Sequence, residues 1–173
     1  EYISKITSTP PEERIGFIPK LLNIATMSSD GNSSKIDRTL EILEKTIFEK
    51  RKAVIFSYFN NPLNQIQKVL NKRGISSEIL IGDVSYEDRS RIINLFQDKN
   101  KFDVLLCNGK VAGEGINLTK ASVVIFVNEA WNPSANRQAE DRVNRMGQEN
   151  DIDIYYLRSA YSIDENINIY IIF

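Results

Sequence analysis

The stretch Ala53-Val-Ile-Phe-Ser57 marks the point where helical periodicity gives way to short, almost wholly apolar runs. Four further runs follow, each separated from the next by an amphipathic stretch. A buried strand of a parallel sheet has this continuous apolar pattern, and the amphipathic stretches are typical of crossover helices. The five predicted strands are Ala53–Ser57, Glu78–Ile81, Phe102–Cys107, Ser122–Val127 and Ile152–Leu157.

The helices expected between these strands have recognisable ends. Asn61-Pro62 predicts an N-terminal cap followed by a first-turn proline, and Gly74 is the expected left-handed residue after that helix. Asn132-Pro133 opens another helix, which we expect to continue to Gly147. Buried strands alternating with helices predict an α/β sandwich, a mainly parallel sheet with helices on both faces.

Residues 1–51 are predicted to form helices joined by one loop, and residues 52–160 the α/β core. Ser34-x-x-Asp37 is a capping pattern before an amphipathic helix. Residues 161–173 contain Ser162-x-x-Glu165, the cap of a last helix that we expect to be truncated. The chain begins at Glu1 and not at a methionine, so we expect it to be an excised piece of a longer protein.

The composition excludes several function classes. A chain of 173 residues, 42% hydrophobic and 26% charged, has room for one soluble globular domain. It has no histidine and one cysteine, which excludes Cys/His metal sites, Ser-His-Asp triads and intrachain disulfides. Its longest apolar runs fall well short of the ~20 residues that cross a bilayer. Because the net charge is -1, any nucleic-acid-binding surface must be local.

Chemistry is expected at three loops, because ligands of open α/β sheets bind beyond the carboxyl ends of the strands. These loops follow Ser57, Cys107 and Val127. The Ser57 hydroxyl could contact a phosphate, and its alternative role is to cap the next helix. Trp131, the only tryptophan, could anchor the core or press on a base or sugar.

A glycine-rich stretch follows the predicted strand that ends at Cys107. Its members are Gly109, Lys110, Gly113 and Gly115. Backbone amides in such a loop can approach an anion closely and a lysine can neutralise it, whereas the alternative is a turn that needs glycine for its backbone angles alone. A Walker A loop is excluded because Val111 follows Gly109-Lys110, and a dinucleotide fingerprint is excluded because Leu118 occupies a required glycine position.

The stretch from Trp131 to Gln148 contains two arginines on a predicted helix. Its apolar stripe is expected to comprise Ala135, Ala139, Val143 and Met146, with Gln138, Arg142 and Arg145 beside it at i, i+4 and i+7. Guanidinium groups on a cleft wall can grip phosphate oxygens. The alternative is a solvated face on which Asp141 and Arg145 form an ordinary i, i+4 pair, and the spacing leaves both interpretations open.

Together these stretches resemble the second motor domain of Swi/Snf-type DNA-translocating ATPases. Lys52-Ala-Val-Ile-Phe-Ser57 is similar to helicase motif IV, and Gly113-Glu-Gly-Ile-Asn-Leu118 to motif V. Trp131-Asn-Pro, followed by Gln138-Ala and Arg142-x-x-Arg145-x-Gly-Gln148, is similar to motif VI and is the most specific match. The resemblance covers nearly the whole chain and implies a RecA-like three-layer sandwich.

The resemblance also implies a role for individual residues. Arg142 and Arg145 would be arginine fingers that stabilise charge on the transferred phosphoryl group of ATP. The residues near the nucleotide would be Gly113, Glu114, Gly115 and Gln138, and those facing the backbone of double-stranded DNA would be Ser57, Asn108, Lys110 and Trp131.

The partners implied are a first RecA-like lobe of the same polypeptide, double-stranded DNA, and a DNA-bound protein or nucleosome, with no membrane. ATP and Mg²⁺ would be held mainly by the first lobe, so this domain alone is expected to bind neither and to hydrolyse no ATP. An intracellular location is implied, nuclear in a eukaryote and cytoplasmic in a prokaryote.

Three positions depart from the family pattern. Asn144 stands where histidine is usual, Asn108 replaces a hydroxyl residue, and Val111-Ala112 replaces an Ala-Gly pair. Two alternatives of other classes are a non-catalytic protein-interaction module that retains the fold, and a small-molecule nucleotide-binding enzyme with a Rossmann-like sheet.

Overall fold

The computed structural model describes residues 16–26, 33–98, 101–112, 115–130 and 132–166. Within these residues five parallel strands form one sheet in the order β2-β3-β1-β4-β5. The strands are β1 (Lys52–Ser57), β2 (Ser77–Leu80), β3 (Val104–Asn108), β4 (Ala121–Phe126) and β5 (Asp153–Tyr156). Each predicted strand is therefore confirmed to within two residues at either end.

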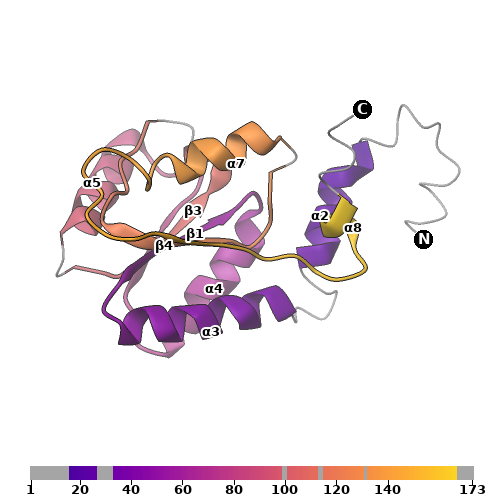
Figure 1. The fold of residues 1–173 in the computed structure, drawn as a ribbon, viewed down its shortest axis with the longest axis horizontal. Coiled ribbons are helices and arrows are strands. Elements are labelled where there is room, and N and C mark those ends of the chain that lie inside the picture. The colour runs from indigo at the N-terminus through magenta and orange to yellow at the C-terminus, as the bar shows by residue number, and fades with distance from the viewer. Residues whose placement is uncertain (1–15, 27–32, 99–100, 113–114, 131, 167–173) are drawn as a thin grey trace, which may run out of the picture.

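Helices cover both faces of the sheet, as the sequence predicts (Figure 1). The helices α3 (Ser34–Phe48) and α4 (Asn60–Lys72) cover one face, and α5 (Tyr86–Gln97) and α7 (Pro133–Glu140) cover the other. A four-residue helix, α6 (Gly109–Ala112), follows β3 directly. Near the carboxyl ends of the strands, α2 (Ile18–Thr26) packs against α8 (Ile163–Asn166).

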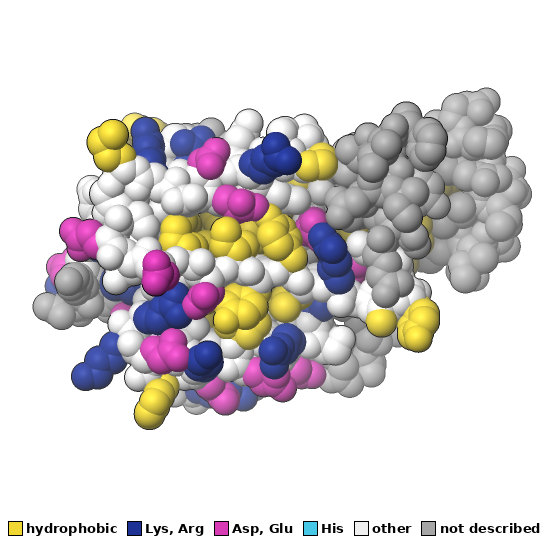
Figure 2. Space-filling view, viewed as in Figure 1, with side chains coloured by type: hydrophobic (Ala, Val, Ile, Leu, Met, Phe, Trp, Pro, Cys, Tyr) yellow, Lys and Arg dark blue, Asp and Glu magenta, His cyan; other side chains and the backbone are white. Residues whose placement is uncertain are grey.

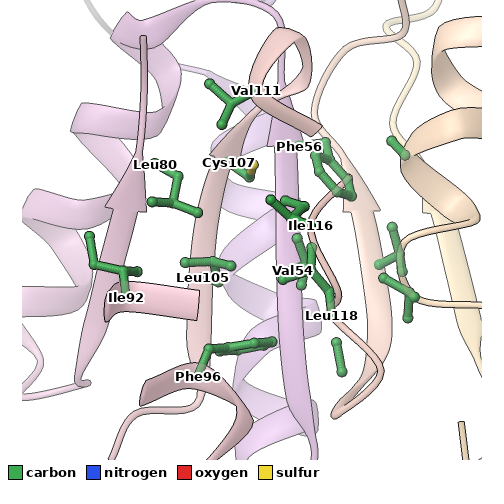
Figure 3. Close-up of a cluster of buried hydrophobic side chains, with 14 of the residues drawn as sticks. Val54, Phe56, Leu80, Ile92, Phe96, Leu105, Cys107, Val111, Ile116 and Leu118 are labelled. Carbon is green, nitrogen blue, oxygen red and sulfur yellow. The ribbon is translucent and has the colours of Figure 1, made fainter. Parts of the chain in front are cut away.

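The sheet separates two hydrophobic clusters because successive side chains of a strand point to opposite faces. In β1, Val54 and Phe56 pack on the α5 side, as Figure 3 shows, whereas Ala53 and Ile55 pack against α3 and α4. Every residue of β1, β3 and β4 is buried, which explains their uninterrupted apolar runs. β2 and β5 are the edge strands and are only partly buried.

The carboxyl end of α5 is capped by Lys52, the first residue of β1. The Lys52 ammonium donates to the carbonyl oxygens of Phe96, Asp98 and Phe102 at 2.8, 2.6 and 2.7 Å. It also lies 5.1 Å from the centre of the Phe96 ring. The last carbonyl oxygens of a helix have no intrahelical donor. The buried Lys52 ammonium group therefore supplies a donor to the carbonyl oxygens at the end of α5.

Two predicted N-caps are wrong, and two other predicted helix ends are confirmed. The N-cap of α3 is Ser33, one residue before the predicted Ser34, and its side chain accepts from the amide of Ile36. α4 begins at Asn60 and makes no side-chain cap, so Asn61 is not its N-cap. Gly74, with φ +70°, is left-handed as expected, and Asn132 caps α7 as predicted.

The largest error concerns the end of α7, which stops at Glu140 and does not reach Gly147. Asp141 is its C-cap, and the chain then turns, with Gly147 at φ +101°. Val143 is buried, but Met146 is 97% exposed, so the predicted apolar stripe does not extend to Met146. Gln138, Arg142 and Arg145 consequently do not share one helix face.

A buried ion pair links α3 to α8. Lys35 Nζ lies 2.7 Å from Asp164 Oδ2, and both side chains are almost completely buried. Burial lowers the pKa of Lys35, and the neighbouring Asp164 carboxylate opposes that shift. Among the described helices, none is long and apolar enough to cross a membrane.

Candidate functional site

A groove opens at the carboxyl edge of the sheet, with a volume of about 450 Å³. It is lined by Asn23, Tyr58, Phe59, Asn60, Asn61, Gly82, Asn108, Lys110 and Val111. Among these nine described lining residues, Lys110 is the single charged one, and four are asparagines. The groove therefore combines neutral hydrogen-bonding groups with one exposed cation, which suits a ligand that presents a phosphate group.

Asn108, the last residue of β3, and Lys110, just beyond it, both line this groove, as topology predicts for the carboxyl end of a parallel strand. Asn108 Oδ1 accepts from the Lys110 amide at 3.0 Å, and its Nδ2 donates to Asn60 Oδ1 at 2.7 Å. The Asn108 side chain thus joins the first residue of α4 to α6. Lys110 is exposed, so its ammonium group is accessible.

Ser57 occupies a different position from the one its predicted role requires. Its side chain is fully buried, donates to the Phe59 carbonyl at 2.9 Å and accepts from the Phe59 amide at 3.1 Å. Asn128 Nδ2 also donates to this hydroxyl, at 3.2 Å. In this conformation Ser57 presents no surface to a phosphate, and its hydroxyl instead holds the turn that enters α4.

Tyr58 is wedged between α6 and α7. A Cβ placed on Gly109 would lie 2.4 Å from the Tyr58 ring, so only glycine fits there. Tyr58 Oη donates to Asn136 Oδ1 at 3.4 Å, and burial raises the pKa of Tyr58 to about 12. Gly109 is therefore needed for a close approach and not for a left-handed backbone angle.

Gly115 is glycine for the other reason that the sequence allows. Its φ is +76° and a Cβ there would meet nothing within 4 Å. The following turn is held from α5, because Gln97 donates to the Asn117 carbonyl at 3.0 Å and accepts from the Lys120 amide at 3.2 Å. Gly113, Glu114 and Trp131 lie outside the described residues.

Residues 141–148, which we call the arginine turn, contain Arg142 and Arg145. The Leu118 amide donates to the Arg142 carbonyl at 2.9 Å, and Gln148 Nε2 donates to the Ala121 carbonyl at 2.7 Å. Ala121 is the first residue of β4, so the turn lies at the amino end of that strand. The backbone of the arginine turn therefore does not lie at the carboxyl edge, where the loops after Ser57, Cys107 and Val127 are found.

This arrangement brings the main chain of Arg142 beside Leu118. Arg145 is exposed and Arg142 is partly exposed, whereas the backbone that carries them is tied to the body of the domain. Gln138 is exposed on α7, before the helix ends. The candidate site thus has two parts, the groove at one edge and the arginine turn at the other end of α7.

Sequence reasoning missed the buried amides that assemble the groove. Asn128 is fully buried, donates to Thr26 Oγ1 at 3.2 Å and accepts from the Tyr58 amide at 2.8 Å. Asn136 accepts from the Ala130 amide at 2.9 Å. The position of Asn128 in the sequence could have indicated its role, because it directly follows the apolar run that ends at Val127.

The parallel sheet, its strand order and the loops after β1 and β3 define a RecA-like α/β domain. The helicase conserved C-terminal domain family matches residues 34–147, well over half of the chain. A structure described as the C-terminal part of the Fun30 ATPase domain has a TM-score of 0.75 and 31% identity, over 88% of this chain and 50% of that one. The Sulfolobus solfataricus SWI2/SNF2 ATPase core in complex with double-stranded DNA has a TM-score of 0.79 and 29% identity, over 96% of this chain and 37% of that one.

Curated relatives agree with these structures. Protein CHROMATIN REMODELING 24 of Arabidopsis thaliana is 35% identical over 96% of the chain, and an uncharacterized ATP-dependent helicase of Mycoplasma pneumoniae is 34% identical over 96%. The chain spans only 16% and 17% of these two relatives. The chain belongs to the helicase conserved C-terminal domain family and is a second RecA-like domain of the Swi/Snf type.

Proposed function

We propose that this domain is the C-terminal motor lobe of an ATP-dependent double-stranded DNA translocase or remodeller. In this proposal Arg142 and Arg145 act as arginine fingers toward a nucleotide held mainly by a first RecA-like lobe. Gly113, Glu114, Gly115 and Gln138 lie near that nucleotide. The groove faces the DNA backbone.

The arginine turn carries the proposal. Its backbone is fixed by Leu118 and Gln148, so the two guanidinium groups extend from a rigid support. A planar guanidinium is well suited to stabilising charge that develops on phosphoryl oxygens. Because such groups act without reorganising, a fixed backbone is the feature that this chemistry requires.

The test joins this domain to a first lobe and measures ATP turnover with saturating DNA. Replacing Arg142 or Arg145 with alanine should lower kcat by roughly 10³- to 10⁵-fold, because arginine fingers contribute that much in other nucleotide hydrolases. Arg137→Ala is the matched control, since Arg137 is exposed on α7 before the turn. DNA affinity should stay unchanged in all three variants, and normal turnover of Arg142→Ala would refute the proposal.

For the DNA contact we propose Lys110 and Asn108 in the groove, together with Trp131. Ser57 then acts indirectly, by holding the turn at Phe59. Contacts of this kind go to phosphate oxygens and are independent of sequence, which suits a motor that moves along any DNA. The complex of the SWI2/SNF2 core with double-stranded DNA supports this assignment by similarity.

Lys110→Ala should reduce the slope of log affinity for DNA against log salt by about one phosphate contact. Lys101→Ala is the control, because Lys101 is exposed just before β3 at the opposite end of that strand. An unaltered salt slope for Lys110→Ala would count against the contact.

Mg²⁺ belongs to the first lobe in this proposal, where it would neutralise phosphate charge. Among the described residues of this chain, no group of three acidic, cysteine or histidine side chains gathers to hold a metal ion. The sequence also has no Walker A loop, so the isolated domain should hydrolyse no ATP. A nucleosome or another DNA-bound protein is the proposed target of the complete motor.

A further inference from the structure

Glu140 is the residue from which the arginine turn departs. As the last residue of α7, it uses its carbonyl oxygen to accept from the amides of Val143 and Asn144, at 2.9 and 2.8 Å. Its side-chain carboxylate accepts a hydrogen bond from the hydroxyl of Tyr156 in β5. Main chain and side chain of one residue therefore tie the arginine turn both to itself and to the sheet.

Tyr156 is a firm support for that carboxylate. It pairs with Phe126 in register across β4 and β5, and the two rings stack with centres 4.7 Å apart and planes 5° from parallel. Phe126 stacks in turn on Phe56 of β1, at 5.2 Å. Burial and the Glu140 carboxylate both raise the pKa of Tyr156, so the phenol keeps the proton that it donates.

The other contacts that hold the arginine turn on the domain are made by residues further along it. Val143 is fully buried, Leu118 contacts the Arg142 carbonyl, and Gln148 reaches β4. The hydrogen bond from Tyr156 to Glu140 holds the start of the turn, two residues before Arg142. β5 is an edge strand, and Figure 2 shows hydrophobic side chains gathered along the middle of the face where it lies.

We propose that Tyr156 is a positioning residue for Arg142 and acts through Glu140. The stacked rings transmit the position of the sheet to the end of α7, and the hydrogen bond sets where the arginine turn begins. The inference rests on the proposed function, because it presumes that Arg142 reaches a nucleotide. A misplaced catalytic group can cost large factors in rate even where binding is intact.

The test uses the two-lobed protein and compares Tyr156→Phe with Tyr155→Phe. The first variant keeps the stacked ring and removes the hydroxyl, and the second removes a hydroxyl from the same strand on the opposite face of the sheet. Tyr156→Phe should lower kcat about 10- to 100-fold with unchanged KM for DNA, whereas Tyr155→Phe should not. Equal kcat in both variants at temperatures where both are folded would overturn the inference.

Substitutions of Glu140 test whether Tyr156 acts on Arg142 through the Glu140 carboxylate. Glu140→Leu should lower kcat as much as Tyr156→Phe, and the double variant should lose no more than either alone, because both remove one hydrogen bond. Glu140→Gln keeps an acceptor oxygen and should recover turnover relative to Glu140→Leu. Additive losses, or equal losses for Gln and Leu, would overturn the route. If Arg142→Ala leaves turnover intact the proposed function fails, whereas a defect in Arg142→Ala without one in Tyr156→Phe defeats only the inference.

Discussion

The groove and the arginine turn are held together by different kinds of hydrogen bond. At the groove, side chains link separate segments: Asn108 bonds to Asn60, and the buried Ser57 and Asn128 next to the groove hold the turn after β1. In the arginine turn, main-chain groups and the Gln148 side chain make the hydrogen bonds that hold it on the domain. Function in the groove should therefore depend on its shape as well as on Lys110, and function in the turn on the identity of two arginine side chains.

The two regions also differ in what supports them. α2 contributes Asn23 to the groove and packs on α8, and Leu22, Phe59 and Ile163 form a small cluster between them. The arginine turn instead rests on the main sheet through Val143 and Gln148. The groove therefore depends on elements from both ends of the described chain, and the turn on the core alone.

The largest expected effect on stability comes from breaking the buried ion pair between Lys35 of α3 and Asp164 of α8. Lys35→Met or Asp164→Leu should each cost about 3 to 5 kcal/mol in the free energy of unfolding, because either leaves a buried charge without its partner. The double variant should regain most of that loss, since two apolar side chains replace two desolvated charges. Urea denaturation of the chain measures all three, and additive losses would show that the charges do not act as a pair.

The next effect separates shape from chemistry within the groove. Gly109→Ala should cost about 1 to 3 kcal/mol and weaken DNA binding, because its Cβ would displace the Tyr58 ring. Gly82→Ala is the matched control in the same groove, where a Cβ meets nothing within 4 Å, and it should change stability by at most about 0.5 kcal/mol. Thermal denaturation and DNA titration provide the readouts. Similar behaviour of the two variants would mean that Tyr58 can move aside freely.

These two regions also differ in how far the sequence predicts them. Apolar runs locate the strands, and parallel topology then places Asn108 and Lys110 together at one edge. The position of the arginines depends on where α7 ends, which periodicity misjudges. Val143 continues the apolar spacing, yet it is buried from a turn that begins after Glu140. Just after that end, the Leu118 amide donates to the Arg142 carbonyl, a tertiary contact that local periodicity cannot reveal.

Gly109 and Gly115 also differ in how far the sequence predicts their roles. Gly109 and Gly115 are equivalent in the sequence, as members of one glycine-rich stretch. In the structure Gly109 is required by the Tyr58 ring and Gly115 by its positive φ. Only the first reason depends on a distant part of the chain, so only the first was beyond prediction from local sequence.

A third prediction tests the arginine turn without touching its charges. Gly147→Ala should cost about 1 to 2 kcal/mol, because φ of +101° strains any residue with a Cβ although the space around it is open. In the two-lobed protein it should lower kcat and leave DNA affinity unchanged, the reverse of what we expect for Gly109→Ala. Weakened DNA binding in Gly147→Ala would show that the two regions are not independent.

The smallest effect concerns Cys107, which is fully buried in the same hydrophobic cluster as the groove residue Val111. Burial raises the pKa of its thiol to about 12 from an ordinary value of 9.0. Between these values the folded state binds more protons than the unfolded state, so the free energy of unfolding falls as pH rises above about 9. At pH 10 this contribution amounts to about 1 kcal/mol.

Cys107→Ala removes this term, so its stability should decline less steeply between pH 8 and 10 than that of the unsubstituted chain, whatever its stability at pH 8. The pKa of Tyr58 is raised by burial and further by Cys107, so Cys107→Ala also removes the smaller part of that shift, which lessens the decline in the same direction. Urea denaturation at each pH gives the two slopes. Equal slopes would mean that the thiol ionises in the folded state, and hence that water reaches Cys107 more freely than its packing indicates.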